Sequence, residues 1–161
     1  MISANQLKEF AFFEGFNEAE LEKVASVATE ETHEAGTQMY KSGDPARGLY
    51  MVREGKILLV MEVNLGPQSP PMQVTVDVVT KGDSSGWSAV VEPYIFTLGA
   101  LCIDRTKLIA IEATGLRRLM EEDCTLGYRV MKATAKIISQ RLNHTRIVLV
   151  GERGLSTMTQ Y

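Results

Sequence analysis

The sequence EAGTQMYKSGDPARGLYMVREG, at residues 34–55, alternates short apolar runs with turns that contain glycine. The runs at residues 37–40 and 49–52 have the length and composition of β-strands. The glycines around them suit positions where the backbone reverses tightly or adopts a positive φ: Gly36, Gly43, Gly48 and Gly55. Strands this closely spaced predict an antiparallel roll or barrel.

The same pattern continues along the chain and predicts four further strands, at residues 57–63, 73–79, 97–103 and 107–112. The segment between the first two of these contains Pro67, Pro70 and Pro71. Proline cannot donate a hydrogen bond to a central strand, so residues 64–72 are expected to form an extended hairpin loop.

Helical periodicity flanks the predicted strands on both sides. Apolar residues at spacings of three and four within residues 4–29 predict two short helices, with Asn17 as an N-cap and Glu20 at the capping-box position. After the strands we expect a short helix at residues 116–121 and a long one from about 125 to 150, ended by Gly151. The acidic run Glu121-Glu122-Asp123 suits the N-terminus of the long helix.

The predicted fold class is therefore α+β. It is an antiparallel β-roll, of the jelly-roll or cupin-like double-stranded β-helix kind, flanked by short N-terminal helices and a long C-terminal helix. We expect a single domain over residues 1–161. It divides into helices to about residue 30, the roll at 31–113, helices at 114–150 and a loosely ordered tail at 151–161.

The composition argues against several classes of protein. A net charge of -3 disfavours a dedicated nucleic-acid binder, and two histidines do not make the usual histidine metal site. Cys102 and Cys124 lack CxxC spacing and are expected to be free, reduced thiols. With no secretion signal and no apolar run of about 18 residues, a cytoplasmic protein outside the membrane is expected. We expect no enzymatic activity, because no P-loop, GxSxG or HExxH pattern occurs.

The order of these elements resembles the cyclic-nucleotide-binding domain family, the sensor half of catabolite-activator-type regulators. The resemblance runs from about Phe10 to Val150, and its most specific part is the spacing of Gly36, Gly43-Asp44, residues 49–52 and Gly55. It implies a small-molecule sensor fold. Activators of this family continue from the long helix into a helix-turn-helix domain. Here about ten residues follow the predicted helix, so no direct sequence-specific DNA binding is expected.

The resemblance also places a phosphate-binding cassette at residues 82–100. In the family this cassette has the sequence Phe-Gly-Glu-Leu-Ala-Leu, followed by Arg-Ser/Thr-Ala about ten residues after the glutamate. The amides at a helix N-terminus and the arginine hold the phosphate. The candidate ligand-binding residues that it implies here are Gly86, Trp87, Ser88, Ala89, Val90, Thr97 and Leu98. Trp87 replaces the glutamate and Thr97 or Leu98 the arginine. No arginine occurs between Arg53 and Arg105, which predicts weak or altered binding of cyclic nucleotides.

Four interpretations of this cassette remain open. Trp87 fills the roll as a core side chain, or Trp87, Tyr94 and Phe96 line a pocket for a less anionic small ligand. The third is weak cyclic-nucleotide binding through the helix N-terminus and its serines. The fourth is haem, with His33 as a ligand.

The long helix carries an apolar stripe and a basic one. The apolar stripe, Leu126, Val130, Ala133, Ile137 and Leu142, predicts either a homodimer seam or packing on the roll, and the length of the helix favours the dimer. The basic stripe would contact nucleic acid or an acidic protein partner, or it is a solvated face: Arg129, Lys132, Lys136, Arg141 and Arg146.

These expectations leave two hypotheses for function. The first is a stand-alone sensor or regulatory module of the cyclic-nucleotide-binding kind, in which a small ligand or a partner at the roll changes the packing of the long helix. The second is a ligand-independent dimeric adaptor whose pocket is plugged by Trp87.

Overall fold

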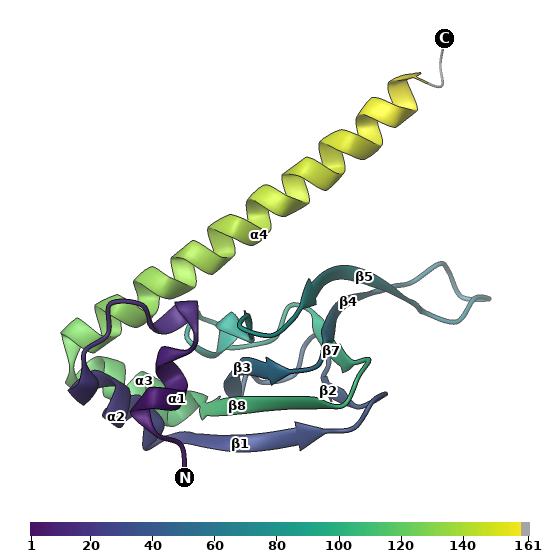
Figure 1. Cartoon of the computed structure of the whole chain (residues 1–161). Helices are drawn as coiled ribbons and strands as arrows, with labels where there is room; N and C mark the ends of the chain where they lie inside the picture. Colours follow the sequence, from purple (N-terminus) through teal and green to yellow (C-terminus); the bar gives the residue numbers. More distant parts are fainter. Residues whose placement is uncertain (159–161) are drawn as a thin grey trace.

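The computed structural model describes residues 1–158, with side chains through Glu152 (Figure 1). Two four-stranded antiparallel sheets form the roll. The first sheet has the order β1-β8-β3-β6, with strands β1 (Ala28–His33), β8 (Thr106–Glu112), β3 (Gly48–Glu54) and β6 (Ser84–Ser85). The second has the order β2-β7-β4-β5, with β2 (Gln38–Tyr40), β7 (Gly99–Cys102), β4 (Ile57–Val63) and β5 (Met72–Val79). The predicted α+β roll is therefore confirmed.

Short helices precede the roll. They are α1 (Ala4–Lys8), the 3-10 turn η1 (Ala11–Phe13) and α2 (Glu18–Ala25), one more element than the two helices predicted. The capping box at the start of α2 is confirmed: the Glu20 amide donates to Asn17 Oδ1, and the Asn17 amide donates to Glu20 Oε2, each at 2.9 Å. These reciprocal bonds satisfy two amides that the helix itself leaves free, so the local sequence fixes where α2 begins.

Strand β1 (Ala28–His33) was not predicted from the sequence. Helical periodicity extended to residue 29, but α2 ends at Ala25 and Ala28 already pairs with Ile111 of β8. The apolar residues Val24, Val27 and Ala28 fit helical spacing, yet pairing with β8 decides the conformation, which is a tertiary effect that periodicity does not contain. The two-residue strand β6 was also missed, and β7 is shorter than the predicted strand at residues 97–103.

The helices after the roll are α3 (Ala113–Glu122) and α4 (Cys124–Met158), joined at Asp123. Asp123 caps α4 by accepting from the Leu126 amide at 3.1 Å, whereas Glu121 and Glu122 belong to the end of α3. Figure 1 shows α4 packed at its start against the other helices and extending far past the sheets.

The predicted end of α4 at Gly151 is wrong. The helix continues to Met158, so residues 152–158 are helical rather than a loose tail, and residues 159–161 of the predicted tail lie outside the described residues. A helical glycine costs only about 1 kcal/mol relative to alanine, and no proline follows to stop the helix. Gly151 also lacks the positive φ of a C-cap glycine.

The proline-containing segment between β4 and β5 forms a hairpin loop, as predicted. Figure 1 shows this hairpin projecting from the roll. The core lies between the sheets and under the helices, and its largest fully buried side chains include Leu49, Met51, Ile109 and Leu116. Across residues 1–158, no helix is long and apolar enough to cross a membrane.

Candidate functional site

The cassette is built on a glycine that no other residue replaces without strain. Gly86 has φ +87°, in the left-handed region, and a Cβ there would lie 2.7 Å from the Gly48 carbonyl oxygen. The 3-10 turn η2 (Trp87–Ala89) follows, with the Ala89 amide donating to the Gly86 carbonyl at 3.0 Å. The close approach of this turn to β3 therefore requires glycine at position 86.

A stack of aromatic rings fills the interior next to this turn. The Tyr40 and Phe96 rings are nearly parallel, with centroids 3.6 Å apart, and the Tyr50 ring lies 5.8 Å from Tyr40. A Cβ on Gly86 would come within 3.4 Å of Phe96 and 3.2 Å of Tyr50, so the stack lies directly against the cassette. Tyr40 is 7% exposed and Phe96 4%, which leaves the rings almost no contact with solvent.

The serines of the cassette are buried, and Ser85 is already satisfied. Its Oγ lies 2.7 Å from the Tyr40 hydroxyl, so that either group donates to the other. Ser84 and Ser88 are also buried. Burial raises the pKa of Tyr40, although the hydrogen bond to Ser85 opposes this, and burial raises the pKa of Tyr50 to about 12. Both phenols are neutral at physiological pH, so the stack brings no charge to the cassette.

Two arginines bind the ends of the cassette through backbone carbonyls. Arg117 of α3 donates from Nη1 to the Ala89 carbonyl at 2.7 Å and lies 4.2 Å from the centroid of the Tyr94 ring. Arg141 of α4 donates from Nη2 to the Ser84 carbonyl at 2.6 Å, and its Nε lies 3.5 Å from Asp77 Oδ2. Both guanidinium groups connect the cassette to the C-terminal helices, and neither belongs to the loop where the sequence pattern expects an arginine.

The predicted ligand-binding residues do not all converge. Gly86, Ser88, Ala89 and Val90 are buried together in the turn. Thr97 is exposed, and its carbonyl accepts from the Ser42 hydroxyl at 3.1 Å, while Leu98 packs against the core.

Trp87, a predicted plug of the roll, is only half-buried and lies outside the buried core. The rings that fill the interior are those of Tyr40 and Phe96. Their contact joins β2 to the loop before β7, so no local pattern pointed to it.

His33, the residue considered as a haem ligand, lies on the edge strand β1. Its Nε2 is 2.8 Å from Glu31 Oε2 on the same strand. Within the described part of the chain, no group of three or more histidine, cysteine or acidic side chains is placed to hold a metal ion.

A small cavity lies beside the cassette, between the β5–β6 segment and α4. Its volume is about 260 Å³, and it is lined by side chains of both charges and by apolar ones. The polar lining residues are Asp77, Asp83, Ser84, Gln140, Arg141 and His144. Because Arg141 crosses from α4 to Ser84 here, the cavity borders the contact that links α4 to the cassette.

The predicted dimer stripe on α4 is largely used within the chain itself. Leu126 and Val130 are fully buried, and Ala133 and Ile137 pack against the core. Only Leu142 of the stripe is substantially exposed, at 49%. This face of the helix therefore packs on its own roll and N-terminal segment.

Comparisons with known proteins agree with this geometry. Residues 30–123 match the family model of the cyclic nucleotide-binding domain. The fold is similar to that of a protein from Geobacter metallireducens GS-15 named as cyclic nucleotide-binding. The two chains share 25% identity over 88% of this chain and 99% of that chain, with a TM-score of 0.76.

The fold is also similar to the regulatory subunit of a cAMP-independent protein kinase A from Trypanosoma brucei, solved as a mutant bound to cAMP. That likeness has 18% identity over 89% of this chain and 48% of that chain, with a TM-score of 0.69. Glutaminase 1 of Bradyrhizobium diazoefficiens is 25% identical over 139 residues, which are 85% of this chain and 21% of that protein. The chain thus spans about a fifth of the length of this relative.

Proposed function

Because the chain belongs to the cyclic nucleotide-binding domain family, as its turn residues predicted, we propose that it is a regulatory module that works without tight binding of a cyclic nucleotide. It acts through the packing of α4 on the roll. The observation that carries this proposal is the Tyr40–Phe96 stack against Gly86, which occupies the space next to the cassette.

The charges around the cassette support the same conclusion. A phosphate bound in a buried site gains about 1.5–3 kcal/mol from each charge-assisted hydrogen bond, which corresponds to at least about tenfold in affinity. The position expected to supply the arginine is Thr97 or Leu98, and neither is cationic. Arg117 and Arg141 donate to the Ala89 and Ser84 carbonyls from α3 and α4, so neither arginine stands at the cassette position where the family has its phosphate-binding arginine.

The family includes a precedent for this behaviour. The regulatory subunit from Trypanosoma brucei is described as part of a cAMP-independent kinase, and its cAMP-bound form is a mutant. The fold alone therefore does not imply that cAMP is the ligand. The similarity to Glutaminase 1 covers a fifth of that enzyme, and we infer a regulatory, non-catalytic role for this chain, in the cytoplasm, where its two free thiols stay reduced.

The module is proposed to form a homodimer through a face of α4 other than the one predicted from sequence. A second, mostly apolar stripe shares only Leu142 with the predicted one and has spacings of four, three, four, three and four residues: Met131, Ala135, Ile138, Leu142, Thr145 and Leu149. At about 100° per residue it lies about 120° around the helix from the buried stripe. All of these residues except the half-buried Ile138 are exposed, and the spacing is that of a coiled-coil seam. A change at the cassette would reach this seam through Arg141.

Isothermal titration calorimetry with cAMP and with cGMP tests the nucleotide part of the proposal. We expect no binding by the wild-type chain. A dissociation constant in the micromolar range for either nucleotide would overturn the proposal. A thermal-shift measurement adds a second readout, because ligand at about 100 times its dissociation constant stabilises a protein by about 2.7 kcal/mol.

Sedimentation equilibrium tests the dimer. We expect the wild type to be dimeric and Leu142→Glu to be monomeric, because a carboxylate would then lie in the apolar seam. Gln140→Glu, two residues away and outside the stripe, adds the same charge and should leave the dimer intact. A monomeric wild type, or equal behaviour of the two variants, would exclude this seam.

The cavity beside Arg141 favours a second candidate, a sensor of a small polar metabolite. Its lining offers carboxylates at Asp77 and Asp83 and donors at Gln140 and Arg141, a set suited to a ligand with both cationic and anionic groups. A thermal-shift screen of amino acids and related zwitterions tests it. A stabilising compound whose effect disappears in Gln140→Ala would support this sensor, and a screen without any stabilising compound would exclude it.

A further inference from the structure

A second groove lies nearer the start of α4, between that helix and the η1 turn. Its volume is about 560 Å³, within the range of sites that hold small ligands or a few peptide residues. Phe12 and Ala133 contribute apolar surface to it, and Tyr128, which is 64% exposed, also lines it. The charged lining residues are one carboxylate, Glu14, and three cations of the basic stripe, Arg129, Lys132 and Lys136.

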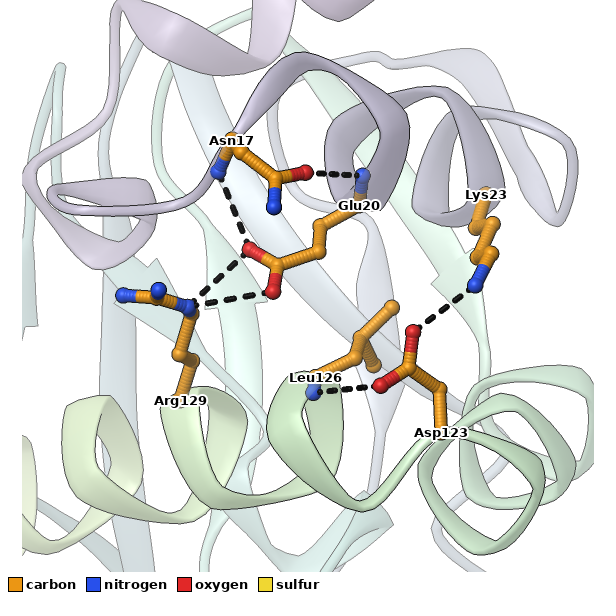
Figure 2. A network of polar contacts seen from close by, with 6 residues as sticks. All are labelled: Asn17, Glu20, Lys23, Asp123, Leu126 and Arg129. Atoms are coloured by element: carbon orange, nitrogen blue, oxygen red, sulfur yellow. Dashed lines mark hydrogen bonds and ion pairs between the residues drawn. The ribbon is translucent and has the colours of Figure 1, made fainter.

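The cations of α4 differ in how they are neutralised. Arg129 is paired inside the chain: its Nε lies 3.1 Å from both carboxylate oxygens of Glu20, which is only 4% exposed. Figure 2 shows that Glu20 also holds the Asn17 amide, so Arg129 is fixed to the start of α2. Arg141 is paired with Asp77 on β5. Two of the cations are therefore matched by carboxylates from other elements.

Lys132 and Lys136 are not matched in this way. Both are exposed, and among the side chains that the structure describes, neither has a carboxylate within ion-pair distance. Lys132 makes only a long cation–π contact, 6.0 Å from the centroid of the Tyr128 ring. The two lysines are four residues apart on one face of the helix, and like charges at this spacing destabilise a helix by about 0.2–0.5 kcal/mol. Residues 124–151 contain no aspartate or glutamate to relieve this repulsion.

We propose that this groove binds an acidic peptide segment of a protein partner. Carboxylates of the peptide pair with Lys132 and Lys136, and one apolar side chain of the peptide packs over Phe12 and Ala133. A short acidic peptide fits better than a nucleic acid, because the groove joins apolar surface to only two unmatched cations. Nucleic-acid binding depends on many cations that contact successive phosphates.

The inference does not depend on the proposed function at the cassette. The groove is lined by residues 11–15 and by α4, and no residue of the cassette is among its lining residues. A failure of nucleotide or dimer experiments would therefore leave this site standing, and a failure here would leave the regulatory proposal standing.

The test is selection of random short peptides displayed on phage against the chain of residues 1–161, followed by fluorescence anisotropy of the most enriched peptide. We expect the enriched sequences to contain acidic residues flanking an apolar one. We also expect the peptide to bind more weakly as ionic strength rises from about 0.05 M to about 0.3 M. No enrichment, or enrichment of neutral sequences, would overturn the proposal.

Two double variants locate the binding. The double variant Lys132→Gln with Lys136→Gln should raise the dissociation constant of the peptide by about fivefold or more, the loss expected for two partly exposed charge pairs. Lys56→Gln with Lys81→Gln makes the same charge change at exposed positions away from the groove and should bind as the wild type does. Equal weakening in both would mean that binding follows total charge alone and would overturn the site.

Both double variants should melt within about 1–2 °C of the wild type, because all four lysines are exposed. Competition by a single-stranded oligonucleotide that binds more tightly than the peptide would show a nucleic-acid surface instead, which also overturns the proposal.

Discussion

Removing the Phe96 ring tests the central claim that the roll is filled by its own side chains. Phe96 is 4% exposed and is stacked on Tyr40 with ring centroids 3.6 Å apart. Truncation of a buried phenylalanine to alanine costs about 3–5 kcal/mol, because transfer energy is lost and a cavity remains. For a chain of this size 1 kcal/mol corresponds to about 2–4 °C, so the melting temperature of Phe96→Ala should fall by about 6–20 °C.

The measurement is thermal and urea unfolding followed by circular dichroism, with Ile95→Ala as the matched control. Ile95 precedes Phe96 in the same loop but is 42% exposed, so its truncation should cost less than about 0.5 kcal/mol. Indole added to the Phe96→Ala protein should restore part of the lost stability, because a dry apolar cavity of this kind binds small aromatic molecules.

A loss below about 1 kcal/mol in Phe96→Ala, close to that of the control, would refute the reasoning. It would mean that the ring leaves the interior at little cost, and a ligand would then find the space next to Gly86 open. The proposal of a nucleotide-independent module would lose its main support.

Three further predictions concern other parts of the site. Gly86→Ala should destabilise the protein by at least about 1 kcal/mol more than Gly82→Ala in urea unfolding, because both glycines have φ near +90° but only Gly86 is crowded by backbone; equal losses would exclude the clash. The free energy of unfolding should fall as pH rises from about 10 towards 12, because Tyr50 ionises in the unfolded chain near its ordinary pKa but in the folded chain only at about 12. Over this pH range the urea midpoint of Tyr50→Phe should fall less than that of the wild type. An equal fall in both would assign the effect to another group. Glu20→Gln should lower the free energy of unfolding by about 1–3 kcal/mol in thermal unfolding, because it removes the buried carboxylate that pairs with Arg129 of α4. Glu18→Gln, which removes an exposed ion pair, should lower it by less than about 0.5 kcal/mol. Similar losses in both variants would show that the α2–α4 pair does not stabilise the fold.

What the sequence could predict was mostly local. The capping box at Asn17 and Glu20 depends on residues three apart, and the prolines of the β4–β5 loop act on their own backbone, so both were found correctly. Gly86 was named only through the family resemblance, and its left-handed φ was not predicted, although glycine is the residue that adopts this conformation most readily.

What the sequence could not predict depends on contacts between distant segments. The Tyr40–Phe96 stack joins residues 56 apart, and the Arg141–Ser84 bond joins residues 57 apart. Neither has a local pattern. The apolar stripe of α4 was recognised, but periodicity does not say which surface covers it; the buried part lies against the core of its own chain, with α3 and η1 as neighbours.

The length of α4 turns small motions into large ones. The helix has 35 residues, about 52 Å, and Arg141, at its middle, donates to the Ser84 carbonyl of the roll. The remaining 17 residues to Met158 span about 25 Å, so a tilt of about 10° about Arg141 would swing the far end by about 4 Å. A change at the cassette that altered the direction of α4 by this amount would therefore also displace, by several ångströms, anything bound near residue 158.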